Sequence, residues 1–100
     1  MTTRIAIAGL GAIGRAVARR LTDGLPGLSL SAIATGNAGK ARDWLKEQNI
    51  DCPVVELEEF PERADLAVEC APASLLERIC KPMLEAGKQV MVLSLSLIHI

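Results

Sequence analysis

Residues 9–14, which read Gly-Leu-Gly-Ala-Ile-Gly, constrain the fold of this chain more than any other feature. They follow a short apolar run, residues 4–8, which has the length and composition of a buried β-strand. After them, Ile13, Val17 and Leu21 recur at the spacing of one helix face. Glycines at G-x-G-x-x-G spacing between a strand and a helix are typical of a loop that holds the pyrophosphate of a dinucleotide.

Each glycine has its own reason to be glycine in such a loop. Gly9 permits the tight turn, Gly11 leaves room for the pyrophosphate, and Gly14 lets the helix pack closely on the strand. The free amides and the positive dipole end of the helix near Ala12 would then favour the phosphate charge. A glycine turn of purely structural use is the alternative, and the strand–loop–helix order argues against it.

The rest of the chain continues the alternation of strands and helices. Further strands are predicted at residues 28–34, 53–55, 65–70 and 89–93. Helices are predicted from residue 12 to the glycine at 24, at 38–48 and at 74–86, with a turn of helix at 57–61. This order predicts an α/β fold, a Rossmann-type doubly wound parallel sheet of about five strands with helices on both faces. We assign residues 1–94 to this one NAD(P)-binding domain.

Three local signals refine these elements. Pro53 places the short third strand at an edge of the sheet, because proline cannot donate to a strand ladder. Ser74 and Glu77 have the spacing of a capping box at the start of the last helix, and Pro82 interrupts that helix. The apolar face of the 38–48 helix includes Trp44, which we interpret as a packing residue.

The choice between NAD and NADP depends on the end of the second strand. An NAD site usually has an acid there that bonds the ribose 2′-hydroxyl, but residues 35–37 are Thr-Gly-Asn and no acid lies between Gly24 and Arg42. Lys40 and Arg42 could approach a 2′-phosphate, or they could simply keep the helix surface charged. The sequence therefore predicts a site that takes NAD or NADP.

The loop after the fourth strand, Cys70-Ala71-Pro72, should flank the cofactor at the same carboxyl edge of the sheet, near the nicotinamide ribose. We interpret Cys70 as a packing residue, because no histidine outside the suspect tail described below could activate it as a nucleophile. Glu69 is either an exit residue that faces water or a polar contact near the ribose. The predicted cofactor contacts are Gly9, Leu10, Gly11, Ala12, Ile13, Gly14, Thr35, Gly36, Asn37, Cys70, Ala71 and Pro72.

Charge and cysteine content exclude several classes of function. The formal charge is −1 with both signs interspersed, which gives no basic footprint for nucleic acid or for a membrane surface. No apolar stretch is long enough to cross a bilayer. The three cysteines lack metal-ligand spacing, so we expect no metal site, reduced thiols and a cytoplasmic protein.

The last residues, 95–100, read as the translation of a widely used transposon-derived sequencing adapter. We therefore expect a non-native tail there, and a natural protein that continues past about residue 94. His99, the one histidine of the chain, would then take no part in its chemistry. An incomplete last strand would expose apolar surface, which makes a homo-oligomer possible.

With these features, the chain resembles the N-terminal domain of the L-aspartate dehydrogenase family, which is related to the NAD-binding domain of homoserine dehydrogenase. The resemblance covers residues 4–94 and rests on residues 5–15, 67–72 and 86–94. It implies reversible oxidation of L-aspartate to iminoaspartate with NAD or NADP, a step of NAD biosynthesis. It also implies a second domain, absent here, that binds L-aspartate and holds the acid/base histidine, so no catalytic residue is expected in this chain.

Other interpretations of the same residues stay open. Homoserine dehydrogenase and enzymes similar to dihydrodipicolinate reductase have comparable cofactor domains, and the Gly14-Arg15 pair suits the latter. A non-catalytic Rossmann module that senses nucleotides is the alternative from outside the enzymes.

Overall fold

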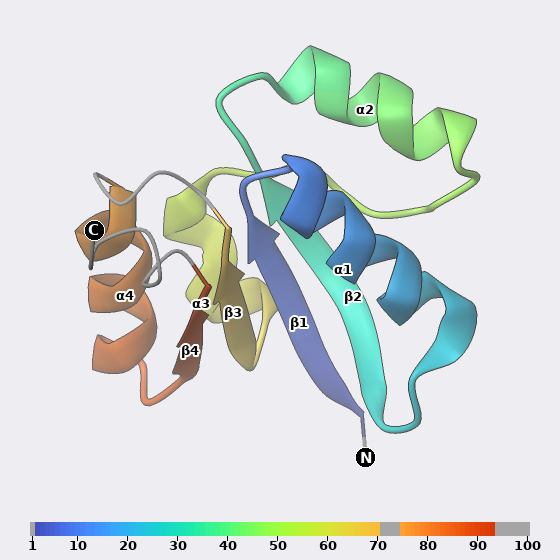
Figure 1. The fold of residues 1–100 in the computed structure, drawn as a ribbon. Coiled ribbons are helices and arrows are strands. Elements are labelled where there is room, and N and C mark those ends of the chain that lie inside the picture. The colour runs from blue at the N-terminus through green and yellow to red at the C-terminus, as the bar shows by residue number, and fades with distance from the viewer. Residues whose placement is uncertain (1, 71–74, 94–100) are drawn as a thin grey trace.

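The computed structural model describes residues 2–70 and 75–93, and Figure 1 shows their arrangement. Ala71 and Pro72 of the predicted site, Ser74 of the predicted capping box and the tail 95–100 lie outside the described residues. The elements in chain order are β1 (Thr3–Ala8), α1 (Ala12–Gly24), β2 (Leu28–Ala34), α2 (Ala38–Glu47), η1 (Leu57–Glu59), α3 (Phe60–Arg63), β3 (Leu66–Glu69), α4 (Leu76–Glu85) and β4 (Gln89–Val92).

The sheet is parallel, with the strand order β2-β1-β3-β4. The chain passes from β1 to one side through β2, and to the other side through β3 and β4. The strand order therefore reverses between β1 and β3, as in a doubly wound fold. In such sheets the ligand crevice lies beyond the carboxyl ends of the strands at this reversal.

The predicted third strand is the main correction to the expected fold, because the described residues form a sheet of four strands rather than about five. Residues 53–55 make one isolated bridge, in which the Ile33 amide donates to Pro53 O (3.0 Å) and the Val55 amide donates to Ile33 O (2.8 Å). The segment does lie beside the edge strand β2, as Pro53 predicts. It pairs no further because proline lacks an amide hydrogen.

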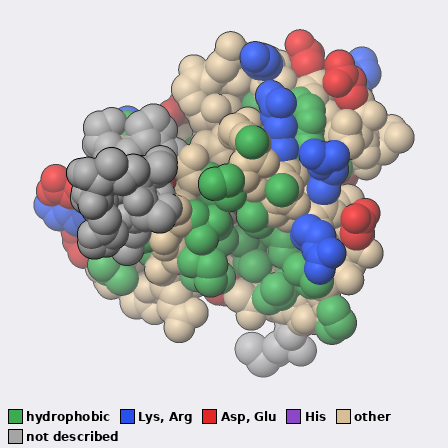
Figure 2. All heavy atoms as spheres, viewed as in Figure 1, with side chains coloured by type: hydrophobic (Ala, Val, Ile, Leu, Met, Phe, Trp, Pro, Cys, Tyr) green, Lys and Arg blue, Asp and Glu red, His purple; other side chains and the backbone are tan. Residues whose placement is uncertain are grey.

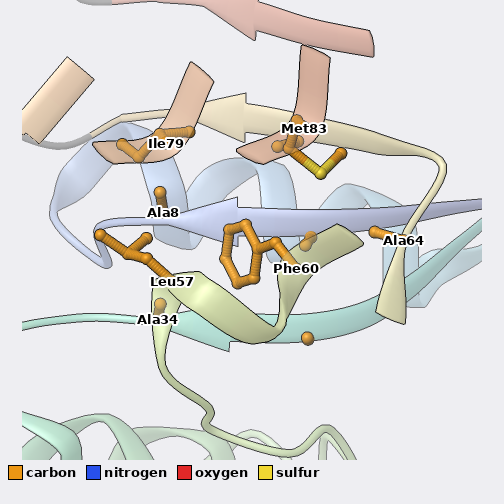
Figure 3. Packing of buried hydrophobic residues seen from close by; sticks show 10 residues of the cluster. Ala8, Ala34, Leu57, Phe60, Ala64, Ile79 and Met83 are labelled. Atoms are coloured by element: carbon orange, nitrogen blue, oxygen red, sulfur yellow. The ribbon is translucent and has the colours of Figure 1, made fainter. Parts of the chain in front are cut away.

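Helices cover both faces of the sheet, as the alternation predicts (Figure 1). In β1, Ile5 and Ile7 face α1 and α2, whereas Ala6 and Ala8 face α3 and α4. The small alanine side chains leave room on the second face for Phe60 of α3, whose side chain lies over β1 in one cluster with Ile79 and Met83 of α4 (Figure 3). Successive side chains of a strand point to opposite faces of the sheet, and both faces of this parallel sheet are buried.

The chain between the bridge and β3 is more ordered than a single turn of helix. The Glu56 carboxylate accepts a hydrogen bond from the backbone at Glu59, and the Glu59 carboxylate accepts one from the Glu56 amide, which forms a capping box. η1 and α3 follow without a break, so Leu57 and Phe60 are both buried. In α4 the helix continues through Pro82, which the sequence predicted would interrupt it.

Asp65 joins the starts of three strands at the end of the sheet opposite the carboxyl edge. Its carboxylate accepts hydrogen bonds from the Arg4 amide (2.9 Å) and forms ion pairs with the Arg4 guanidinium (3.3 Å) and Lys88 Nζ (3.5 Å). The Arg4 amide and then the Arg4 side chain lower the pKa of Asp65 from 3.8 to about 2. The folded state therefore gains stability from ionised Asp65 above the ordinary pKa, and loses it as the pH falls toward about 2.

We expect Asp65→Asn to remove the contribution of Asp65 to the pH dependence of folding stability. Urea unfolding midpoints of the wild type and of Asp65→Asn should differ near neutral pH and converge as the pH falls from 3.8 to about 2. Asp43→Asn, an exposed position on α2, is the matched control and should follow the wild type. A constant difference between the wild type and Asp65→Asn at every pH would contradict this role of Asp65.

Candidate dinucleotide-binding site

Three segments that lie far apart in the sequence meet at the carboxyl edge of the sheet. The Gly9 amide donates to Ala34 O (2.7 Å), which joins the glycine loop to the end of β2. The Cys70 amide donates to Ala8 O (2.8 Å), which joins the end of β3 to the end of β1, directly before the glycine loop. The point where the strand order reverses is therefore the point where the predicted site residues come together.

Each glycine of the loop has a different geometry. Gly9 has φ of 94°, in the left-handed region that glycine adopts without strain. Gly14 is buried, and a Cβ there would collide with the carbonyl oxygen of Gly9. A Cβ on Gly11 would meet no atom within 4 Å, because Gly11 faces open space at the site. Gly9 and Gly14 thus serve the turn and the packing, and Gly11 leaves the space free.

Within the described part of the chain, the first amides of α1 have no hydrogen-bond acceptor, and they lie next to this space. Gly11 is its N-cap residue and makes no side-chain hydrogen bond, and the first turn holds no acid. The first amide that donates to the loop is that of Arg15, to Gly11 O (2.9 Å), so the amides of Ala12 and Ile13 precede the helical ladder. Ala12 and Ile13 are exposed. This arrangement suits an anion such as a pyrophosphate.

A pocket of about 600 Å³ lies at this edge, within the range of about 300–1,000 Å³ for small-molecule sites. Of the predicted contacts it is lined by Gly9, Leu10, Gly11, Thr35, Gly36 and Cys70. Ala12, Ile13, Gly14 and Asn37 are not among its lining residues. Asn37 borders a smaller pocket that shares Leu10 and Thr35 with the large one.

Sequence reasoning missed eight of the residues that line the pocket. They are Ala8, Ala34, Ala38, Val55, Glu56, Leu57, Leu75 and Arg78. Arg78 on α4 forms an ion pair with Glu58 on η1 (3.1 Å), which joins two walls of the pocket and lowers the pKa of Glu58. The alanines could have been found from their place at the strand ends, but the sequence carries no signal that brings Val55, Leu57 and Arg78 together.

The acid and the thiol at the end of β3 are not placed for catalysis. Glu69 has no exposed surface and lies on the α4 face of the sheet, so the interpretation as an exit residue facing water is wrong. Burial, and then the charge of Glu69, raise the pKa of Cys70 to about 11. The half-buried thiol therefore stays protonated at neutral pH, which fits the interpretation of Cys70 as a packing residue.

Lys40 and Arg42, which the sequence placed near the end of β2, lie at different pockets in the structure. Lys40 borders the smaller pocket, whereas Arg42 borders a different one, next to Lys46 and Asn49. Arg15 is half-buried, and its guanidinium carbon lies 5.8 Å from the centre of the Trp44 ring. Trp44 packs against the core, as predicted, and also forms a surface for Arg15.

Two classes of site find no support in residues 2–70 and 75–93. No helix in these ranges is long and apolar enough to span a membrane. No group of three or more His, Cys, Asp or Glu side chains in the same ranges is placed to hold a metal ion.

Solved structures similar to this chain share its fold. A scyllo-inositol dehydrogenase from Lactobacillus casei, with bound NAD(H) and scyllo-inositol, matches with a TM-score of 0.77 and 22% identity, over 92% of this chain and 28% of that one. A myo-inositol 2-dehydrogenase from Lactobacillus plantarum matches with a TM-score of 0.77 and 23% identity, over 92% and 28%. At this identity the likeness establishes the fold alone.

Two relatives have a higher sequence identity to this chain than these solved structures have. The L-aspartate dehydrogenase 3 of Bordetella bronchiseptica is 46% identical over 91 residues, which are 90% of this chain and 34% of the relative. The L-aspartate dehydrogenase of Bradyrhizobium diazoefficiens is 41% identical, over 91% and 32%. This chain thus spans about a third of the length of these relatives. The family described as homoserine dehydrogenase, NAD binding domain, matches residues 9–99. The chain belongs to this family of NAD-binding domains.

Proposed function

We propose that this chain is the cofactor-binding part of an oxidoreductase that acts on the CH–NH₂ group of L-aspartate and gives iminoaspartate, with NAD or NADP. The observation that carries the proposal is the pocket where the glycine loop meets the ends of β2 and β3, with Gly11 facing open space. The relatives named L-aspartate dehydrogenase, at 46% and 41% identity, support the choice of substrate.

In this proposal the residues of the chain hold the cofactor. Gly11 leaves room for the pyrophosphate, and the amides of Ala12 and Ile13 donate to it. Thr35 lies where the adenosine ribose would be, and Cys70 lies toward the nicotinamide end. When bound, the nicotinamide accepts a hydride from the substrate.

The other half of the reaction needs groups from outside this chain. A pocket for the dicarboxylate and a base for the substrate ammonium would come from a further domain, which the relatives' greater length allows for. The chain alone should therefore bind a dinucleotide and catalyse no oxidation. We also propose a cytoplasmic location. We also propose that β4, an edge strand of the sheet on which Met91 is exposed, makes a homo-oligomer possible.

The test uses the longer protein that contains this chain, assayed with NAD⁺ and NADP⁺ for formation of reduced nicotinamide. We expect turnover with L-aspartate and none with L-homoserine, and no turnover by the 100-residue chain with either. Turnover with L-homoserine alone would replace the substrate with that of homoserine dehydrogenase, a candidate that the matching family's description favours. If the longer protein binds a dinucleotide but oxidises neither substrate, the result would favour a nucleotide-sensing module.

A further inference from the structure

A second, smaller pocket opens beside the proposed cofactor site. Its volume is about 50 Å³, which exceeds the ~30 Å³ share of one water molecule and is far below that of a pocket for a whole ligand. It has Leu10 and Thr35 in common with the large pocket, so the two are adjacent. The residues that line it are Leu10, Arg15, Thr35, Asn37, Lys40 and Ala41. A space of this size suits one polar group of a larger ligand.

The pocket lies at the end of β2, where a Rossmann fold meets the ribose of the adenosine half. A carboxylate at this place would bond the 2′-hydroxyl and repel a 2′-phosphate. Among the lining residues there is no acid, and Arg15 and Lys40 are both cationic. Figure 2 shows Lys and Arg side chains over α2 and the neighbouring α1, with Asp and Glu side chains among them, so the charge at the pocket is that of its two lining cations. The electrostatic field at this place therefore favours an anion.

Arg15 is held in position by Trp44. Its guanidinium lies over the indole ring at 5.8 Å, a distance at which a cation and an aromatic face attract. Its Nε is buried and has no hydrogen-bond partner within residues 2–70 and 75–93. In the same ranges neither Arg15 nor Lys40 forms an ion pair. Both charges are thus available, and one of them is fixed before a ligand arrives.

Asn37 and Thr35 complete the pocket. The Asn37 side-chain oxygen accepts a hydrogen bond from the Lys40 amide (3.1 Å) and caps α2, and no acceptor within residues 2–70 and 75–93 takes the Asn37 NH₂ group. Thr35 Oγ1 accepts from the Asn37 amide at 3.5 Å and keeps its own hydrogen for a further acceptor. The amino end of α2, a helix of ten residues, adds its dipole to the two cations.

We propose that this pocket binds the 2′-phosphate of NADP, and that Arg15 and Lys40 select NADP over NAD. The inference rests on the proposed function, because it assumes that the dinucleotide lies along the glycine loop. It goes further in assigning the cofactor preference to two side chains on different helices. Arg42, on the same helix as Lys40, has no part in it because it borders another pocket.

The experiment titrates the 100-residue chain with NADPH and with NADH, and follows nicotinamide fluorescence. The wild type should bind NADPH at least about 10-fold more tightly, because charge-assisted hydrogen bonds to the phosphate add to those shared by both cofactors. Lys40→Gln and Arg15→Gln should each weaken NADPH binding by about 10-fold to 100-fold and change NADH binding by less than about twofold. Arg42→Gln removes the same charge from α2 and should change neither affinity.

The outcomes separate this inference from the proposed function. Equal affinities for NADPH and NADH in the wild type would overturn the inference while leaving the dinucleotide site intact. The inference would also be overturned if the variants at Arg15 or Lys40 weakened the binding of NADPH and of NADH to the same extent. If neither cofactor binds to a chain whose thermal unfolding is cooperative, the proposed function fails and this inference fails with it.

Discussion

Gly11→Ala is expected to weaken dinucleotide binding by about 100-fold, roughly 2.7 kcal/mol, while the fold remains intact. A Cβ at this position meets no protein atom within 4 Å, so the space that it enters is the space that the pyrophosphate would need. Gly11 has φ of −84°, which alanine adopts without strain, so the free energy of unfolding should change by less than about 1 kcal/mol. Fluorescence titration with NADPH and thermal unfolding, on the same preparation, measure the two effects.

This result would be contradicted by a Gly11→Ala variant that binds NADPH as tightly as the wild type. A variant that unfolds at a much lower temperature would also contradict it, since the loss of binding would then follow from loss of structure. Gly36→Ala is a useful comparison. A Cβ there also meets no atom within 4 Å, and the residue lies at the ribose end of the same pocket, so we expect a smaller loss of affinity.

Gly14→Ala should produce the opposite result, although the chemical change is the same and the site is three residues away. The added Cβ would collide with the Gly9 carbonyl oxygen and come within 3.5 Å of the Ile7 side chain. Relief requires α1 to move away from β1, and overpacking of this kind costs about 1–3 kcal/mol. For a domain of this size the melting temperature should fall by about 4–8 °C for each kcal/mol lost.

Thermal unfolding without ligand is the direct measurement for Gly14→Ala. The matched control is Gly39→Ala on α2, where the nearest atom to the added Cβ is 3.9 Å away and where alanine favours the helix. We expect Gly39→Ala to unfold at or above the wild-type temperature. If Gly14→Ala were as stable as the wild type, the close approach of α1 to the glycine loop would not be a requirement of this fold.

The regular elements could be predicted because their patterns are local. The apolar run that ends at Ala8 and the helical spacing from Ala12 gave β1 and α1, and the bounds of β2 agree with the structure. The prediction of a short third strand was wrong. An apolar pair after Pro53 satisfies the strand pattern whether or not its amides find partners. Pairing depends on the neighbouring strand, which a local pattern does not contain.

The glycine loop and the end of β2 could be predicted as one site because the doubly wound topology brings strand ends together. The wall of the pocket formed by η1 and α4 could not be predicted. Leu57 and Arg78 come from η1 and α4, and their approach depends on the buried cluster that contains Phe60 of α3 and Met83 of α4. Side-chain packing between segments far apart in sequence leaves no periodic signal.

The positions of Arg15 and Glu69 show a second limit. Both are charged residues in amphipathic or strand patterns, for which exposure to solvent is the usual expectation. The structure instead places Arg15 against Trp44 and buries Glu69 beneath α4. In each case a neighbouring element covers a side chain that the local pattern would leave outside. The cofactor preference proposed here depends on one of these two residues.

The most direct test of the central claim, that a dinucleotide binds along the glycine loop at the carboxyl edge, is an NMR titration of the ¹⁵N-labelled chain with NADPH. The largest amide shift changes are expected at Gly11, Ala12 and Ile13, next to the pyrophosphate, and further changes at Gly9, Thr35 and Cys70, which line the large pocket. Shift changes concentrated instead around Asn49 and Cys52, in the separate pocket beside α2, would contradict the claim. So would an unchanged spectrum at saturating NADPH.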